Sequence, residues 1–163
     1  MEITRKGTVY QTKGVVPTVG ELAPAFALEN TKGEVVTQES LKGSVVVISV
    51  IPDINTSVCD LQTKAFNQKV AALSGVRLVT ISKNTKEQFL EWCGANGVEM
   101  EMLSDTEFSF GTAYGIYVPE LAVDQRSVFV LDMDGTLAYK EVLVEMVNEP
   151  NYDAALEEAK ELV

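Results

Sequence analysis

Val45–Asp60, with the sequence VVVISVIPDINTSVCD, joins an apolar strand to the start of a helix. Its first six residues, Val45–Val50, are apolar apart from one serine, which is typical of a strand buried on both faces of an α/β sheet. Pro52 has no N–H group to donate to a sheet, so we expect it to end the strand. The polar residues that follow, Asp53–Ser57, offer side-chain acceptors that suit the beginning of a helix.

Cys59 is predicted to lie in the first turn of that helix. Apolar residues then recur at spacings of three and four, at Val58, Leu61, Ala65, Phe66, Val70 and Leu73. A helix N-terminus offers unpaired N–H groups and a partial positive charge, and a cysteine there can have its pKa lowered from about 8.5 to roughly 3.5–7.5. On this evidence alone, a reactive cysteine and a small buried hydrophobic residue are equally good interpretations of Cys59.

Length and charge limit the class of protein. The 163 residues are 46% hydrophobic and 23% charged, which suits one globular domain spanning residues 1–163. The net charge of −11 argues against nucleic acid or an anionic membrane as a partner. The longest apolar runs are only strand-sized, and the first residues lack the apolar core of a signal peptide. We therefore expect a cytoplasmic protein that spans no membrane.

The chain contains no histidine and only two cysteines. Without histidine, Ser-His-Asp and Cys-His catalysis and HExxH zinc sites are excluded, and two cysteines are too few for a zinc site. We therefore expect no metal and no organic cofactor. A reactive cysteine in this chain must be activated by a helix terminus, by a hydroxyl group, or by arginine or lysine.

Strands and helices are predicted to alternate along the chain. The expected elements are a hairpin of strands 3–5 and 8–11 that turns at Gly7, strands 25–28, 35–37 and 45–50, a helix from Cys59 to Gly75, strand 76–82, helix 84–94, strand 100–103, a short helix 108–114 after a capping Ser104 or Asp105, a loop 115–125, strands 127–132 and 137–144, and a helix 154–162. This order predicts an α/β thioredoxin-like fold, in which a central mixed sheet is flanked by helices and an N-terminal hairpin is added.

Pro52–Cys59, PDINTSVC, resembles the P-x-x-x-T-x-x-C signature of peroxiredoxins. The whole chain resembles the thiol peroxidase branch, the atypical two-cysteine peroxiredoxins. Further matches are GELAPAF at 20–26, Trp92-Cys93, RSVFV at 126–130 and EPNYD at 149–153. The resemblance implies a thioredoxin-dependent peroxidase of antioxidant defence that reduces hydrogen peroxide and organic hydroperoxides and forms a homodimer.

The resemblance also implies roles for individual residues. Cys59 is the peroxidatic cysteine that attacks the peroxide, and Cys93 is the resolving cysteine that forms a Cys59–Cys93 disulfide with it. Thr56 hydrogen-bonds to the sulfur and the peroxide, and Pro52 shields the site from water. Arg126 stabilises the negative charge on the sulfur.

The chemistry adds two expectations of its own. The backbone N–H groups of Val58 and Cys59, at a helix start, are natural partners for peroxide oxygens. A disulfide needs the two Cα atoms within about 7 Å. If the cysteines are further apart than this when reduced, one helix end must unwind, so we predict local unfolding around Cys59 and in Trp92–Gly97, where Gly94 and Gly97 ease remodelling.

The residues beside the signature depart from the usual pattern of the branch. Ile51, Asp53 and Asn55 stand where the branch often has Phe or Val, Ser, and Asp, respectively. These positions flank the Pro, Thr and Cys of the signature. They therefore bear on substrate preference and on the fine adjustment of the site, and leave the predicted reaction intact.

Two other functions remain open at this point. The first is a thioredoxin-fold redox sensor or binding module in which the same disulfide alters a partner surface. The second is a structural domain with two inert cysteines. Thr56 and Arg126 favour the peroxidase, because a pure sensor has no need of groups that accelerate turnover.

Overall fold

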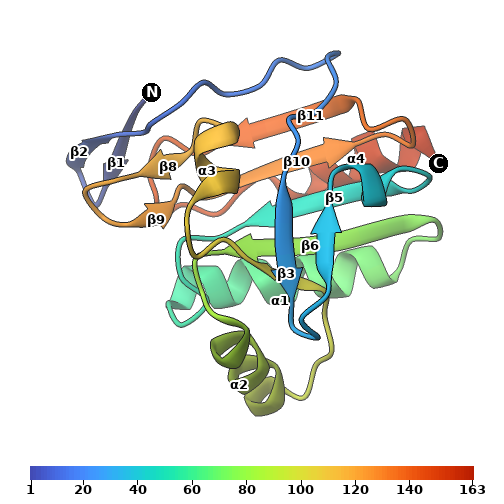
Figure 1. Cartoon of the computed structure of the whole chain (residues 1–163), viewed down its shortest axis with the longest axis horizontal. Helices are drawn as coiled ribbons and strands as arrows, with labels where there is room; N and C mark the ends of the chain where they lie inside the picture. Colours follow the sequence, from blue (N-terminus) through green and yellow to red (C-terminus); the bar gives the residue numbers. More distant parts are fainter.

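The computed structural model describes all residues, 1–163, and is built around a seven-stranded mixed sheet (Figure 1). The strand order is β11-β10-β5-β6-β7-β3-β4. The central strands β5 (Val45–Val50), β6 (Val76–Ser82) and β7 (Met102–Ser104) are parallel. The outer strands β10 (Ser127–Leu131), β11 (Leu137–Val142), β3 (Ala27–Asn30) and β4 (Val35–Thr37) pair antiparallel with their neighbours.

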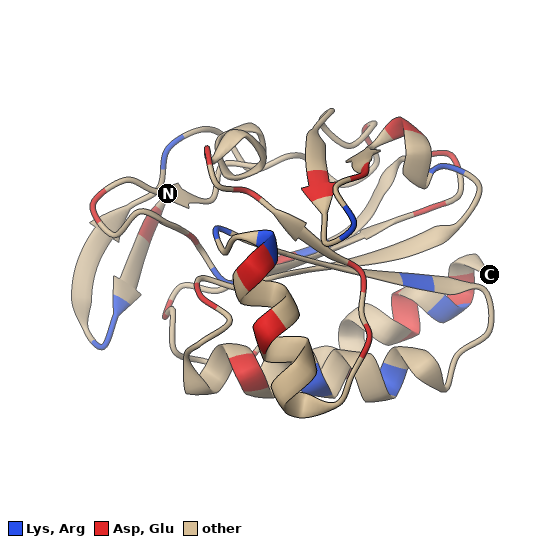
Figure 2. Ribbon diagram, turned by 60° about the horizontal axis from the view of Figure 1, so that its bottom comes forward, with Lys and Arg blue, Asp and Glu red and all other residues tan.

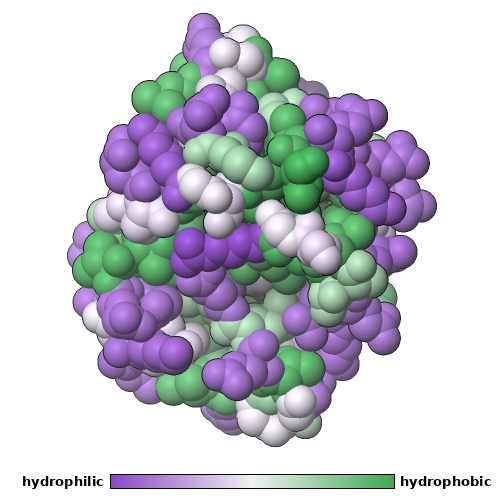
Figure 3. All heavy atoms as spheres, turned by 90° about the vertical axis from the view of Figure 1, so that its right-hand side faces the viewer, coloured by the Kyte–Doolittle hydropathy of each residue, from purple (hydrophilic) through white to green (hydrophobic).

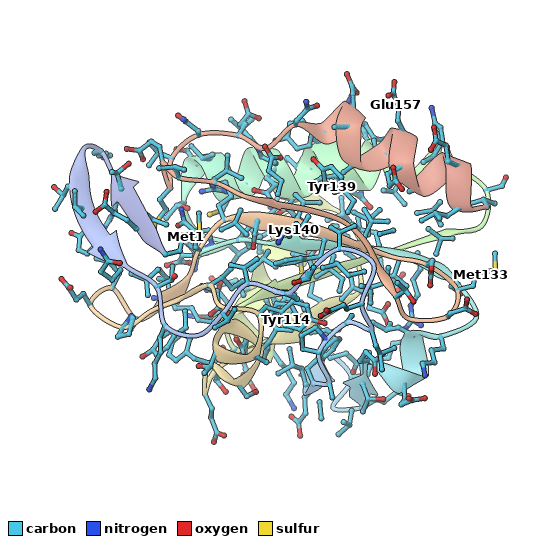
Figure 4. The ribbon with its side chains drawn as sticks, turned by 90° about the horizontal axis from the view of Figure 1, so that it is seen from above. Met1, Tyr114, Met133, Tyr139, Lys140 and Glu157 are labelled. Carbon is cyan, nitrogen blue, oxygen red and sulfur yellow. The ribbon has the colours of Figure 1, made fainter.

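Helices cover both faces of this sheet. Alternate residues of β5 point to opposite faces, so Val45 and Val47 pack against α1 (Ser57–Ala71) and α4 (Tyr152–Leu162). Val46 and Ile48 pack on the other face, in a cluster that includes α3 (Ser109–Ala113). Tyr114 belongs to this second cluster and lies in the interior of the molecule, whereas Glu157 points outward from α4 (Figure 4). The remaining helices are α2 (Lys86–Asn96) and the short 3₁₀ helix η1 (Glu39–Leu41).

Two small hairpins lie together at one end of the sheet (Figure 1). The first is β1 (Glu2–Arg5) with β2 (Thr8–Gln11), and the second is β8 (Tyr117–Val118) with β9 (Val123–Asp124). They share a buried apolar cluster that includes Ile3 and Val118. The turn at Met133 lies at the opposite end of the molecule, as Figure 4 shows.

The expected fold class, with its mixed sheet, flanking helices and N-terminal hairpin, is confirmed, but several details differ. The loop predicted over 115–125 contains the β8–β9 hairpin, whose two-residue strands are too short to leave a periodic signal. Helix α1 ends at Ala71 with Ala72 as its C-cap, so Gly75 lies beyond the helix end. The N-cap of α3 is Phe108, although the predicted Asp105 does bind its backbone, accepting from the N–H groups of Phe110 (3.0 Å) and Gly111 (2.9 Å).

The surface mixes hydrophilic and apolar residues, as Figure 3 shows for one face. Acidic residues outnumber basic ones and recur along α2, as the red bands in Figure 2 show. None of the helices combines the length and the apolar character that crossing a bilayer would require.

Candidate active site

Strand pairing brings Arg126 to the start of α1. In the antiparallel pair of β10 and β5, Ser127 lies opposite Val50, so the residue before Ser127 lies next to the carboxyl end of β5. The chain leaves β5 there and enters α1 a few residues later. This edge of an α/β sheet is where ligands commonly bind.

The Arg126 side chain is buried, with 2% of its surface exposed, and all three of its nitrogens donate hydrogen bonds. Nη2 donates to the sulfur of Cys59 at 3.2 Å. Nη1 donates to Oε1 of Gln62 at 2.9 Å, and Nε donates to the carbonyl oxygen of Met146 at 2.7 Å. A guanidinium stays charged at every relevant pH, so this contact places a fixed positive charge beside the sulfur.

Gln62 is a site residue that the sequence patterns did not indicate. Its side chain is fully buried, and its Nε2 donates to the hydroxyl of Ser49 on β5 at 2.9 Å while its Oε1 accepts from Arg126. Gln62 therefore fixes the guanidinium against the central strand. The signal that could have found it is its spacing of three residues from Cys59, which puts both side chains on one helix face.

Cys59 lies in the first turn of α1, as predicted, and none of its surface is exposed. The first intrahelical bond of this turn runs from the N–H of Asp60 to the carbonyl of Thr56 at 2.9 Å. The N–H groups of Val58 and Cys59 have no acceptor within the protein, as expected for a helix start. Two donors are thus left for a ligand beside the sulfur.

Thr56 occupies the N-cap position of α1 without capping it through its side chain. Its hydroxyl donates to the carbonyl of Asp53 at 2.8 Å and makes no hydrogen bond to the sulfur of Cys59. Thr56, Pro52, Val58 and Arg126 all line a pocket of about 290 Å³. The predicted residues other than the cysteines therefore line one cavity. The sulfur of Cys59 is not part of the lining, but it contacts Arg126, which is.

Cys93 is not bonded to Cys59 in this structure, and both cysteines are free. Cys93 is half-buried on α2 and packs against the apolar cluster that contains Cys59, with its sulfur 3.6 Å from the sulfur of Met102. Burial raises the pKa of the Cys93 thiol, the nearby charge of Glu99 raises it further, and a hydrogen bond with the backbone of Met100 lowers it. The net effect is a raised pKa, which favours the thiol form of Cys93 over the thiolate.

A hydrogen bond links the two cysteine-bearing helices. The indole Nε1–H of Trp92 donates to Oδ1 of Asp60 at 2.9 Å, and these residues are the sequence neighbours of Cys93 and Cys59. The other carboxylate oxygen of Asp60 pairs with Lys64 at 3.0 Å. The bond holds the start of α1 against α2.

Comparisons with known proteins show the family to which the chain belongs. Residues 19–140 match the model of the AhpC/TSA family. The chain is 44% identical to a thiol peroxidase of Bacillus subtilis over 99% of this chain and 98% of the relative, and 40% identical to one of Listeria innocua over 98% of each.

Among solved structures, a peroxiredoxin-like protein from Aquifex aeolicus superposes with a TM-score of 0.93 at 28% identity, over 99% of this chain and 97% of that one. A thiol peroxidase from Chromobacterium violaceum superposes with a TM-score of 0.90 at 16% identity, over 99% and 96%, which bears on the fold alone. The likeness in sequence extends over the whole chain, and the signature cysteine lies against a buried arginine. The chain therefore belongs to the AhpC/TSA family, in its thiol peroxidase branch, and is a peroxidase.

Proposed function

We propose that Cys59 reduces hydrogen peroxide and organic hydroperoxides, that Cys93 resolves the product as a Cys59–Cys93 disulfide, and that thioredoxin reduces this disulfide. The observation that carries the proposal is the 3.2 Å contact between Arg126 Nη2 and Cys59 Sγ at a helix start. A permanent cation and unpaired N–H donors there favour negative charge on the sulfur and on the oxygens of a bound peroxide.

The first step is displacement at oxygen. The Cys59 sulfur, as thiolate, attacks one peroxide oxygen, an S–O bond forms, and the O–O bond breaks. The leaving oxygen takes a proton and departs as water or an alcohol, while the cysteine becomes a sulfenic acid. The N–H groups of Val58 and Cys59 and the guanidinium of Arg126 are the fixed donors for the charge that develops on the leaving oxygen.

The second step condenses two sulfur groups. The Cys93 thiol attacks the sulfenic sulfur, an S–S bond forms, and the hydroxyl leaves as water with the thiol proton. Because Cys59 is fully buried, we infer that the region around Cys59 and the Trp92–Gly97 segment unfold locally in this step. The Trp92–Asp60 bond is a contact that this rearrangement would break. Thiol–disulfide exchange with a dithiol of thioredoxin then restores both thiols and leaves thioredoxin oxidised.

A redox sensor that uses the same disulfide is the rival function. The buried Arg126, with three hydrogen bonds, favours a catalyst, because turnover depends on stabilising a transition state whereas switching depends only on the disulfide. The proposal of a homodimer rests on the family alone, and sedimentation velocity tests it.

The decisive assay couples peroxide consumption to thioredoxin, thioredoxin reductase and NADPH at catalytic protein concentration. We expect many turnovers with the wild type and none with Cys59→Ser. Cys93→Ser, its matched control, should stop after one equivalent with a sulfenic acid at Cys59, detected by intact mass. Consumption of a single equivalent by the wild type would instead indicate a sensor, and unreacted thiols would indicate inert cysteines.

A further inference from the structure

The pocket beside Cys59 is much larger than hydrogen peroxide requires. Its volume is about 290 Å³, whereas one water molecule needs about 10–15 Å³ of the same kind of volume. Part of its lining is apolar, through Leu121, Val123, Met146 and Val147. The space is therefore suited to an organic hydroperoxide with a hydrocarbon portion.

Three further basic residues line the same pocket, Arg5, Lys6 and Lys83. None of them lies within 4 Å of a carboxylate, since the ion pairs of this chain involve other residues. The concentration of positive charge is notable in a chain with a net charge of −11. It also adds to the fixed charge of Arg126 in the same cavity.

The two carboxylates near these cations accept hydrogen bonds from other groups. Asp53 is the one acidic residue in the lining, and its Oδ1 accepts from Asn84 Nδ2 and from the N–H of Asn55, both at 3.0 Å. Glu145 lies behind the β1–β2 turn, and its carboxylate accepts from the N–H groups of Gly7 (3.1 Å) and Val147 (3.0 Å). These hydrogen bonds hold the pKa of Glu145 below its usual range.

The basic turn is fastened to the active site. Arg5 and Lys6 lie at the tip of the N-terminal hairpin, which is blue in Figure 2, and Lys6 has the left-handed φ of 50° that this tight turn imposes. Thr4 exchanges backbone hydrogen bonds of 2.7 Å with Val144 and Met146. Met146 is also the residue whose carbonyl binds Arg126, so the hairpin is attached to the segment that positions the guanidinium.

We propose that Arg5, Lys6 and Lys83 make the enzyme selective for organic hydroperoxides that carry a carboxylate. The peroxide group binds toward Arg126 and Cys59, the carbon chain lies on the apolar lining, and the carboxylate is held by the basic residues. This inference rests on the proposed peroxidase function of Cys59 and adds the substrate class that its pocket prefers.

The test compares one hydroperoxide in two forms, a medium-chain hydroperoxy carboxylic acid and its methyl ester. We expect the wild type to show a higher kcat/KM for the acid, and the acid-to-ester ratio to fall about tenfold in R5Q/K6Q/K83Q, within the range known for electrostatic steering. Raising the ionic strength should lower the wild-type ratio as well. Because the ratio compares two substrates on the same protein sample, a smaller fraction of folded protein lowers both rates equally and leaves the ratio unchanged.

A matched control removes three exposed lysines away from the pocket, in K13Q/K32Q/K160Q, and should leave the ratio unchanged. An equal ratio in the wild type and R5Q/K6Q/K83Q would overturn the inference, as would a wild-type preference for the ester. If the wild type oxidises Cys59 with neither form, the proposed function itself is wrong, and that outcome is distinct from loss of selectivity.

Discussion

Replacing Asp124 by Asn should stabilise the protein at neutral pH. The Asp124 carboxyl is fully buried, and its two oxygens find no partner other than the carboxyl of Asp105. Burial, the hydrogen bond with Asp105 and the charge of Asp105 raise the pKa of Asp124 to about 10. Asp105 differs in its surroundings, because the backbone N–H groups of Phe110 and Gly111 donate to it.

The sign of the effect follows from linkage. A raised pKa keeps Asp124 protonated in the folded state while the unfolded chain ionises at its ordinary value of 3.8. At pH 7 this difference lowers the free energy of unfolding by about 4 kcal/mol, because each pH unit above 3.8 contributes about 1.4 kcal/mol. The loss begins as pH rises past the unfolded pKa and stops near the folded one.

Urea unfolding from pH 5 to pH 8, under reducing conditions, measures the effect. Asn has nearly the same shape, can donate to Asp105 and does not titrate, so the stability of D124N should exceed that of the wild type by a margin that widens by about 4 kcal/mol across this range. The matched variant D105N should instead destabilise, because the backbone of α3 loses a charged acceptor. Parallel stability curves for D124N and wild type would refute the reasoning, since they would mean that Asp124 is ionised in the folded protein.

Three further predictions concern the active site. Arg126→Lys should slow the oxidation of Cys59 about 10²-fold in stopped-flow measurements, because an ammonium cannot reproduce the three-way geometry of the guanidinium; a rate within twofold of wild type would contradict this. Gln62→Leu should slow the same step less, by roughly tenfold, and an unchanged rate would show that Arg126 needs no support from β5. Trp92→Phe removes the bond to Asp60 and should speed formation of the disulfide without speeding formation of the sulfenic acid, as rapid-quench mass spectrometry can resolve; a slower disulfide step would mean that the bond assists the rearrangement.

Elements with strong local signals were predictable from the sequence. Strand Val76–Ser82 has the predicted bounds because a stretch rich in Val, Ile and Thr lies between the turn residues Gly75 and Asn84. Helix α2 begins where expected because Thr85 and Gln88 form a capping box, with side chain and backbone bonded in both directions. In each case, neighbouring residues carry the signal that marks the bounds of the element, although its stability comes from packing and pairing in the fold.

The burial pattern of α1 was harder to predict. Its apolar residues suggested that Leu61 faces the core, yet Leu61 is 52% exposed, and the polar Gln62 and Thr63 are fully buried. The orientation of the helix follows from the contact of Cys59 with Arg126 and from the hydrogen bonds of Gln62 to the sheet and to Arg126. The pattern of apolar residues does not reveal such a buried polar network, because the stability of the network depends on partners that are distant in sequence.

The burial of Arg126 was also hard to predict from the sequence. A charged residue before a strand is ordinarily exposed, and here it is buried because each of its nitrogens meets an acceptor, two on α1 and one at Met146. The antiparallel pairing of β10 with β5 on one side and with β11 on the other brings these segments together. The hairpin that carries Arg5 and Lys6 is tied to one of the same segments, at Met146, so Arg126 and these two pocket cations share one of their supports. A change in how that segment packs should therefore alter the reactivity of Cys59 and the selectivity of its pocket together.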